Sequence, residues 1–449
     1  MRSLLHILAA ALLAAALAHS TAGTASAHEA QHFTVHPNSE FPDGLRFDVA
    51  VDWHAEVTEA RVRYRVLGEQ VSRYDPLEFE PARKFTADLL VRTDTAQRYI
   101  PPGAEIEFSV EVTDASGVVT ESEPQRFVFL DPRFEWTRID APGVYLHYYG
   151  GQEGRALRSL EAAQEALERM GDLMGVEDRG TLRLTVYNGI ADMRRALPPR
   201  SVVQESVLVT EGVSFGDTGV VLLLGGNPEV EGVAAHETVH FLMRRALGRG
   251  AGIVPVWLNE GLAEYANPSP SFSFQNVFSR RLYDNTLLPL TSLTSAPGRP
   301  EDALLMYGQS ESVVTYMIET YGAEPLQALL DRLGAGDTVD EALTAAYGFD
   351  RTGLEHEWRT SIGAPPLAAT PSRSALPTPI PRPTLAPFGF GDTPIFDETP
   401  RPRPAPTQQP ESAPSQEQAS GGCTRAEDGW DAAILASVVL LGLLWRRRR

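Results

Sequence analysis

Two histidines and a glutamate stand close together near the middle of the chain, in the motif His236-Glu237-Thr238-Val239-His240. Residues four apart share one face of a helix, about one turn from each other, so both imidazoles can reach one metal ion. Glu237 sits beside them. The spacing therefore predicts a metal site on a helix, and the alternative is a pair of core histidines satisfied by ordinary hydrogen bonds.

The residues around the motif, 227–248, carry helix signals of their own. Asn227 suits the N-cap, Pro228 the first helical position and Gly248 the stop, while Glu229 and Glu231 complement the positive end of the helix dipole. Apolar residues lie on nearly every side, so the helix should be buried. Polar groups on a buried helix must be satisfied, and a metal ion is one way to do so.

A second helical segment, PVWLNEGLAEY at residues 255–265, follows a glycine-rich turn. Two antiparallel helices joined by a short turn bring Glu260 opposite the histidine pair. His236, His240 and Glu260 then make a three-ligand set with the fourth position open to water, which is the arrangement of a catalytic zinc. Glu264, one turn further along the same face, can accept the second N–H of a ligand histidine.

These motifs resemble those of the gluzincin zinc peptidases. HETVH and WLNEGLAEY are similar to the HExxH and NEG helices of thermolysin-like and aminopeptidase-N-like enzymes, and residues 134–362 most resemble the bacterial peptidase MA-like domain. The resemblance implies that His236, His240 and Glu260 bind Zn²⁺ and that Glu237 is the general base. It also implies that Glu264 supports a ligand histidine from behind.

Tyr307 falls where aminopeptidase-like gluzincins carry a tyrosine that donates to the tetrahedral intermediate, just before an expected helix. A neutral phenol can donate a hydrogen bond to a developing oxyanion. The alternative is a half-buried packing tyrosine.

Two features depart from the aminopeptidase pattern. The gap between His240 and Glu260 is one residue longer, which a turn can absorb. The stretch GVSFGDTGVVLLLGG lacks the Gly-x-Met-Glu-Asn motif that holds a free substrate amine. The resemblance therefore implies an endopeptidase and not an exopeptidase.

Length, charge and cysteine content limit the alternatives. The 449 residues allow two or three domains, and the net charge of -20 argues against a nucleic-acid partner and against docking of the folded body on anionic lipid. Cys423 is the only cysteine, which excludes an intramolecular disulfide and a cysteine-type zinc site.

Residues 28–133 alternate apolar and polar positions between turns such as PDG, PPG and DASG, which predicts an antiparallel β-sandwich of six or seven short strands. The run YIPPGAEIEFSVEVTDASG loosely resembles a fibronectin type III or immunoglobulin-like module. His28, His32 and His36 could bind a metal on a helix, but Phe33, Thr34 and Val35 favour a strand, which spreads the three rings too far apart.

Residues 134–363 predict an α+β peptidase domain with a helical lower lobe. Strands around VYLHYYGG, TLRLTVYNG and GVVLLLGG alternate with helices at 155–174 and 190–197, and the third strand runs into the histidine helix. In the gluzincin family an edge strand aligns the substrate, and residues 213–224 are the candidate here. A polar loop beyond Tyr265 should lead to helices at 310–320, 325–333, 339–346 and 352–361, with His356 on a solvated face.

The two ends of the chain predict export and anchoring. Residues 1–27 have the parts of a cleaved secretory signal, and residues 364–428 have the composition of a Pro-rich disordered stalk. Residues 429–449 hold a short apolar run followed by four arginines, as in a transmembrane anchor. Together with the preceding stretch SGGCTRAEDG, they also resemble a bacterial sorting tail, in which Cys423 would mark a processing or attachment point. The positive-inside rule puts the body of the protein outside the cell membrane.

The sequence thus predicts an exported, membrane-anchored zinc metallopeptidase that cleaves peptide or protein substrates. The main alternative is a catalytically retired peptidase fold that serves as a cell-surface binding or scaffold protein. A second alternative keeps the zinc but hydrolyses a bond other than a peptide.

Overall fold

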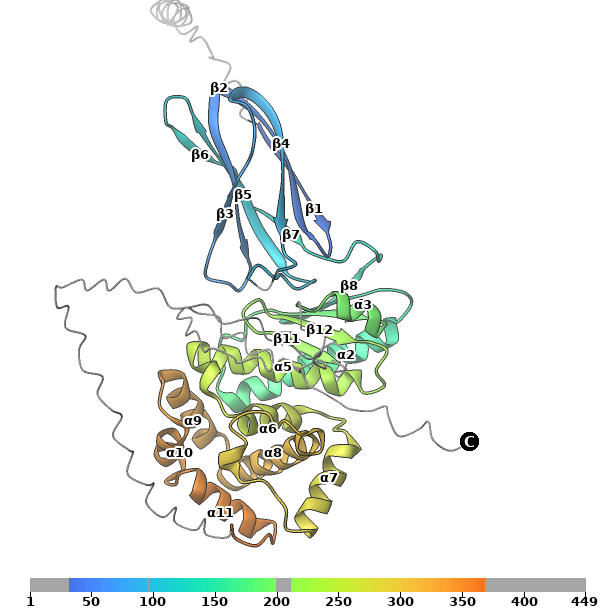
Figure 1. Ribbon diagram of the computed structural model, residues 1–449, viewed down its shortest axis with the longest axis vertical. Helices are drawn as coiled ribbons and strands as arrows, with labels where there is room; N and C mark the ends of the chain where they lie inside the picture. The colour runs from blue at the N-terminus through green and yellow to red at the C-terminus, as the bar shows by residue number, and fades with distance from the viewer. Residues whose placement is uncertain (1–31, 96, 199–210, 368–449) are drawn as a thin grey trace, which may run out of the picture. The chain divides into compact units, whose positions relative to one another are not determined.

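A computed structural model describes residues 32–95, 97–198 and 211–367 of the chain (Figure 1). The expected signal at 1–27, the expected stalk beyond residue 367, Cys423 and the expected anchor at 429–449 lie outside these residues. Within the described ranges, no helix combines the length and the apolar composition that a membrane crossing needs.

The N-terminal part is a β-rich domain, as the alternating pattern predicts. Its strands are β1 (His32–Glu40), β2 (Gly44–Val66), β3 (Arg73–Pro76), β4 (Ala82–Arg92), β5 (Glu105–Asp114), β6 (Val119–Glu121) and β7 (Gln125–Val128). Hydrogen bonds join all seven into one sheet through β2 and β5, so the two-layer sandwich stays a prediction. His32 and His36 lie exposed on β1, and His28 is outside the described residues.

Strand β2 corrects the expectation of short strands, because it continues without a break through 23 residues. No glycine or proline interrupts residues 54–59, so the chain has no reason to turn there. The first half of β2 pairs with β1 and β4, and the second half pairs mainly with β3 and β5. A register shift between Asp52 and Val57 separates the two halves in the pairing with β4.

A five-stranded sheet with the order β11-β12-β10-β9-β8 opens the second domain. The strands are β8 (Thr137–Ala141), β9 (Val144–Tyr148), β10 (Leu182–Tyr187), β11 (Gly212–Phe215) and β12 (Val220–Leu224). β9, β10 and β12 run parallel, and β8 and β11 are antiparallel edge strands. The edge-strand prediction is therefore right for β11 and wrong for β12, whose run of five buried residues is covered by neighbours on both sides.

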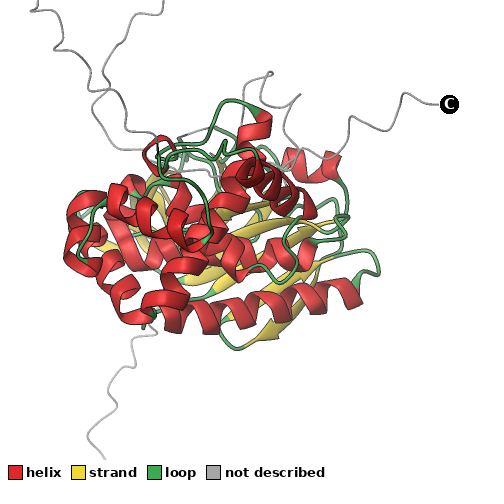
Figure 2. Cartoon of the chain, turned by 90° about the horizontal axis from the view of Figure 1, so that it is seen from below, coloured by secondary structure: helices red, strands yellow, loops and turns green. Residues whose placement is uncertain are grey.

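Helices α2 (Glu153–Met174) and α5 (Val230–Leu247) lie side by side against this sheet, and α3 (Ile190–Arg195) follows β10 (Figures 1 and 2). Helix α5 begins at Val230 and not at Pro228, which corrects the predicted start. The Oδ1 of Asn227 accepts the Glu229 N–H at 3.0 Å, so Asn227 stabilises a turn before the helix and does not cap it.

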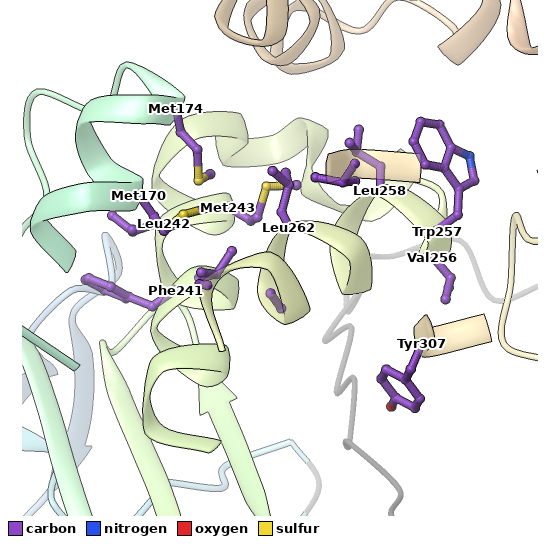
Figure 3. Close-up of a cluster of buried hydrophobic side chains, with 14 of the residues drawn as sticks. Met170, Met174, Phe241, Leu242, Met243, Val256, Trp257, Leu258, Leu262 and Tyr307 are labelled. Carbon is purple, nitrogen blue, oxygen red and sulfur yellow. The ribbon is translucent and has the colours of Figure 1, made fainter. Parts of the chain in front are cut away.

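Methionine and leucine side chains fill the space between α2, α5 and the next helix, α6 (Val256–Ala266). Figure 3 shows Met170 and Met174 of α2 beside Leu242 and Met243 of α5, with Leu262 of α6 close by. All five side chains are buried. This packing fixes α5 and α6 against each other, and these two helices carry the histidine and glutamate motifs.

The remaining elements form the predicted helical lobe. They are the 3-10 helix η1 (Gly248–Ile253), α7 (Phe272–Tyr283), the 3-10 helix η2 (Leu290–Ser292), α8 (Pro300–Tyr321), α9 (Ala323–Ala335), α10 (Val339–Tyr347) and α11 (Arg351–Ser361). His356 lies exposed on α11, as predicted. Its neighbours Glu355 and Arg359 are buried and form an ion pair at 2.8 Å.

Two expectations about this lobe are wrong. The expected polar loop after Tyr265 contains α7, because Phe274 is buried and Val277, Phe278 and Leu282, at helical spacing from it, pack against the same core. Helix α8 starts at Pro300, with Glu301 and Asp302 in its first turn, so it is ten residues longer at its start than the expected helix at 310–320. Tyr307 consequently lies inside α8 and not before it.

His147 on β9 gives the domain a sensitivity to acid. Its side chain is 4% exposed, and burial, with a smaller contribution from Arg138, lowers its pKa to about 4. The neutral form is therefore favoured in the folded state, and stability is lost as the pH falls below the unfolded pKa of about 6.5 towards the folded one. Asp140 acts in the opposite direction but does not cancel the effect.

We expect His147→Leu to remove this sensitivity. Between about pH 7.5 and about pH 5, the wild type should lose about 2 kcal/mol more unfolding free energy than the variant. Urea unfolding of both metal-free proteins at the two pH values measures the difference. Equal losses in the two proteins would show that His147 is not the acid-sensitive group.

Candidate metal centre and active site

The two helices bring all three predicted metal ligands together. His236 and His240 project from α5, with their Nε2 atoms 3.1 Å apart. Glu260 projects from α6, and its Oε2 lies 3.4 Å from the Nε2 of His236 and 3.7 Å from that of His240. One ligand atom from each residue falls within 4.8 Å of the others, so a single ion could contact all three.

The donor set fits a zinc ion. The three side chains are between 2% and 8% exposed. Within the described residues, Glu260 Oε2 is buried and accepts no hydrogen bond, which is costly for a carboxylate oxygen unless a cation lies beside it. Two imidazole nitrogens and one carboxylate oxygen are the protein ligands of many catalytic zinc sites.

The protonation states of the metal-free site also suit a cation. Burial lowers the pKa of His240 to about 4, so its ring is neutral and can bind a metal. Burial acts to raise the pKa of Glu260, but His240 and His236 lower it overall, so the carboxylate is charged. For His236, burial is outweighed by Glu264 and Glu260, which raise its pKa well above the ordinary value. Metal binding would displace the extra proton from His236.

Glu264 lies behind His236, as the sequence predicts. Its Oε1 is 2.9 Å from the Nδ1 of His236, and its side chain is 4% exposed. A carboxylate at Nδ1 holds the proton on that nitrogen and turns Nε2 towards Glu260 and His240. The arrangement fixes both the tautomer and the orientation of the ligand ring.

Glu237 is fully buried on α5, next to the edge strand of the sheet. Gly212, at the start of β11, comes so near that a Cβ added there would lie 2.7 Å from the Cγ of Glu237. The backbone of β11 therefore passes directly against the Glu237 side chain. A larger residue at position 212 would push the strand and the carboxylate apart.

Tyr307 reaches the same region from α8. Its ring is 5% exposed, and its centroid is 6.3 Å from that of His236. It also stacks on Phe274 of α7, with a centroid separation of 4.7 Å and an interplanar angle of 19°. Tyr307 thus packs in the core and also lines a small cavity of about 30 Å³ beside His236.

Several residues of this cavity are not marked by the sequence. Glu211, Glu229 and Phe274 also line it. Burial and the nearby Glu229 raise the pKa of Glu211 to about 7. Glu229 was expected only to complement the helix dipole, and Phe274 lies in the segment expected to be a loop. No local pattern marks Glu211, because only the sheet brings it to the helix.

Comparisons with known proteins agree with this site. Residues 162–364 match the model of the Peptidase MA superfamily. The matched range contains α5, α6 and α8, and with them His236, Glu237, His240, Glu260, Glu264 and Tyr307. None of the curated proteins compared matches the chain. The match and the converging ligands support a gluzincin-like peptidase.

Several solved structures are also similar. An M1 zinc metallopeptidase from Deinococcus radiodurans is 14% identical, over 74% of this chain and 93% of that one, with a TM-score of 0.32. A two-domain M1 zinc metallopeptidase variant bound to L-tryptophan is 13% identical, over 73% and 93%, with a TM-score of 0.34. A bromine derivative of BhCBM56 is 12% identical, over 22% and 97%, with a TM-score of 0.16.

Proposed function

We propose that this protein is a zinc-dependent metallopeptidase that cleaves bonds inside peptide or protein chains. The observation that carries the proposal is the convergence of His236, His240 and Glu260 from two helices, with Glu237 buried beside them. These are the residues that metal-assisted hydrolysis needs, a three-ligand set and a carboxylate next to it.

Each side chain of the site would have its own role in the hydrolysis. His236, His240 and Glu260 would hold a zinc ion, which when bound would lower the pKa of water towards neutrality and polarise a carbonyl group. Glu237 takes the proton of the attacking water and passes it to the leaving amine. Tyr307 donates a hydrogen bond from its phenolic hydroxyl to the developing oxyanion. Glu264 keeps His236 in the orientation that the ligand set requires.

Strand β11 supports the choice of an extended peptide as the substrate. It is an edge strand, paired with β12 on one side only within the described sheet. An extended peptide can add to such an edge through backbone hydrogen bonds. Because Gly212 brings the strand against Glu237, a peptide paired there would run past the general base.

The role of Tyr307 is tested by Tyr307→Phe, which removes the hydroxyl and keeps the ring stacked on Phe274. We expect kcat to fall about 100-fold with little change in KM, because the hydrogen bond forms only in the transition state. Tyr283→Phe is a matched control, because Tyr283 is 86% exposed at the end of α7. If kcat is unchanged in Tyr307→Phe, the tyrosine serves packing alone.

The competing proposal is a retired peptidase fold that works as a binding or scaffold protein. All four positions of the zinc and base set are intact, and a retired site would be expected to have lost at least one. This observation favours the enzyme. Hydrolysis of a bond other than a peptide is the second candidate, and peptide and ester substrates assayed side by side would separate the two activities.

We further propose that the protein is exported and held at the cell surface by residues 429–449. The support comes from the sequence alone, in the signal-like residues 1–27 and the apolar run before the four terminal arginines. Cell fractionation of the full-length protein tests it. Recovery in the soluble medium of a mature chain that still carries residues 429–449 would contradict the anchor.

A further inference from the structure

Asn267 lies directly behind Glu264, at the C-terminal end of α6. Its Nδ2 donates a hydrogen bond to Glu264 Oε2 at 3.2 Å. The other oxygen of the same carboxylate, Oε1, lies 2.9 Å from the Nδ1 of His236. A continuous chain of polar contacts therefore runs from the amide of Asn267 through the carboxylate of Glu264 to a predicted metal ligand.

The amide of Asn267 is itself held in place. Its Oδ1 accepts the N–H of Ser269 at 2.9 Å, so the amide cannot rotate without losing a second hydrogen bond. Gly232 of α5 lies against the same oxygen, and a Cβ added at Gly232 would overlap Asn267 Oδ1. Gly232 is buried on α5, one helical turn before His236. The absence of a side chain there is what allows Asn267 to reach Glu264.

We propose that Asn267 is a positioning residue for the metal centre, and that the absence of a side chain at Gly232 leaves the space that Asn267 occupies. Asn267 does not touch the metal or the substrate. It fixes the rotamer of Glu264, and Glu264 in turn fixes the tautomer and the direction of the His236 ring. Partners of this kind, outside the ligand set, typically change metal affinity by about 10- to 100-fold. The proposal rests on the zinc site of the proposed function.

The Asn267 amide is neutral, and its lack of charge matters as much as its hydrogen bond. Glu264 already has an acidic neighbour in Glu311. Burial and the charge of the Glu264 carboxylate together raise the pKa of Glu311. A neutral donor at position 267 stabilises the Glu264 carboxylate without adding to this negative charge. Asn267→Asp has nearly the same shape but replaces the donor with a carboxylate, which should turn Glu264 away from His236.

The test is zinc affinity, measured by competition with a chelator in the full-length protein. We expect Asn267→Asp to bind zinc about 10- to 100-fold more weakly than the wild type. The matched control is Asn285→Asp, which makes the same change at an exposed position after α7 and should bind zinc as the wild type does. The visible absorption of the cobalt-loaded protein should also change in Asn267→Asp, because it reports the geometry of the ligands.

A second pair of variants keeps the test valid if Asn267→Asp folds poorly. Gly232→Ala adds the Cβ that displaces Asn267, and alanine is the better helix former, so α5 should remain folded. We expect this variant to weaken zinc binding about 10-fold in the wild-type background and to have almost no further effect in Asn267→Ala, where the amide is already missing.

The outcomes separate the two proposals. Equal zinc affinity in Asn267→Asp, Asn285→Asp and the wild type overturns the role of Asn267. An equal loss from Gly232→Ala in both backgrounds shows that Gly232 does not act through Asn267, and it overturns the coupling. A folded wild type that binds no zinc overturns the proposed function together with this inference.

Discussion

Glu237→Gln is expected to lower kcat by about 100- to 10,000-fold while the protein still binds one zinc ion per chain. Glutamine has nearly the same shape as glutamate but cannot accept the proton of water at neutral pH. Glu237 is not one of the three ligands that converge on the metal position, so the donor set should remain complete. The measurements are peptide cleavage rates and zinc content for the same preparation.

The control for this variant is Glu231→Gln, which removes one carboxylate from the same helix. Glu231 pairs with Arg158 at 2.5 Å on the outer side of α5, away from the ligand set. We expect wild-type turnover from it. Wild-type turnover in Glu237→Gln would remove Glu237 from the reaction and leave the protein without its general base.

Glu260→Gln is expected to lose both zinc and activity. Glu260 supplies the only carboxylate oxygen of the ligand set, and its Oε2 has no other partner within the described residues. Residues that merely support a ligand already change metal affinity by about 10- to 100-fold, so the loss of a direct ligand should exceed about 100-fold. Chelator competition measures the affinity, and peptide cleavage measures the activity.

A matched control is Glu301→Gln, which removes an exposed carboxylate in the first turn of α8. It should leave zinc binding and turnover unchanged. If Glu260→Gln keeps wild-type zinc affinity, another group supplies the third ligand. The two experiments differ in kind, since the Glu237 variant separates chemistry from metal binding and the Glu260 variant removes both together.

The metal site could be predicted from the sequence because its information is local. His236 and His240 are one helical turn apart, and Glu260 and Glu264 are again one turn apart on α6. Only a short turn, now seen as η1, separates the two helices. The positions of the three ligands and of the supporting carboxylate therefore depend only on helix periodicity and on the antiparallel pairing of α5 with α6. Short-range sequence patterns indicate both.

Other parts of the site could not be predicted because they depend on tertiary contacts. Glu211 reaches the cavity from the position just before β11, and Asn267 meets Gly232 across two helices. Helix α7, by contrast, has a pattern that indicates a helix, because Phe274, Val277, Phe278 and Leu282 recur at helical spacing and pack in or against the core. For α8, the start signal is present in the sequence, since Pro300 opens the helix and Glu301 and Asp302 follow in its first turn.

In the β-rich domain, too, features that depend on tertiary contacts could not be predicted from the sequence. The alternation of buried and exposed residues predicts strands correctly, but it does not say where one strand ends when no turn residue intervenes. Strand β2 continues through residues 54–59 for this reason. Which residues of neighbouring strands pair is set by contacts distant in sequence, such as Val49 with Ala87 and Tyr64 with Phe108.

The proposal that this chain is a zinc-dependent endopeptidase is tested by cleavage of a peptide library by the purified protein, before and after zinc removal. We expect cuts at internal peptide bonds that disappear when a chelator removes the metal and return when zinc is added back. A folded, zinc-loaded protein that cuts no peptide in the library would contradict the claim and favour the binding or scaffold alternative.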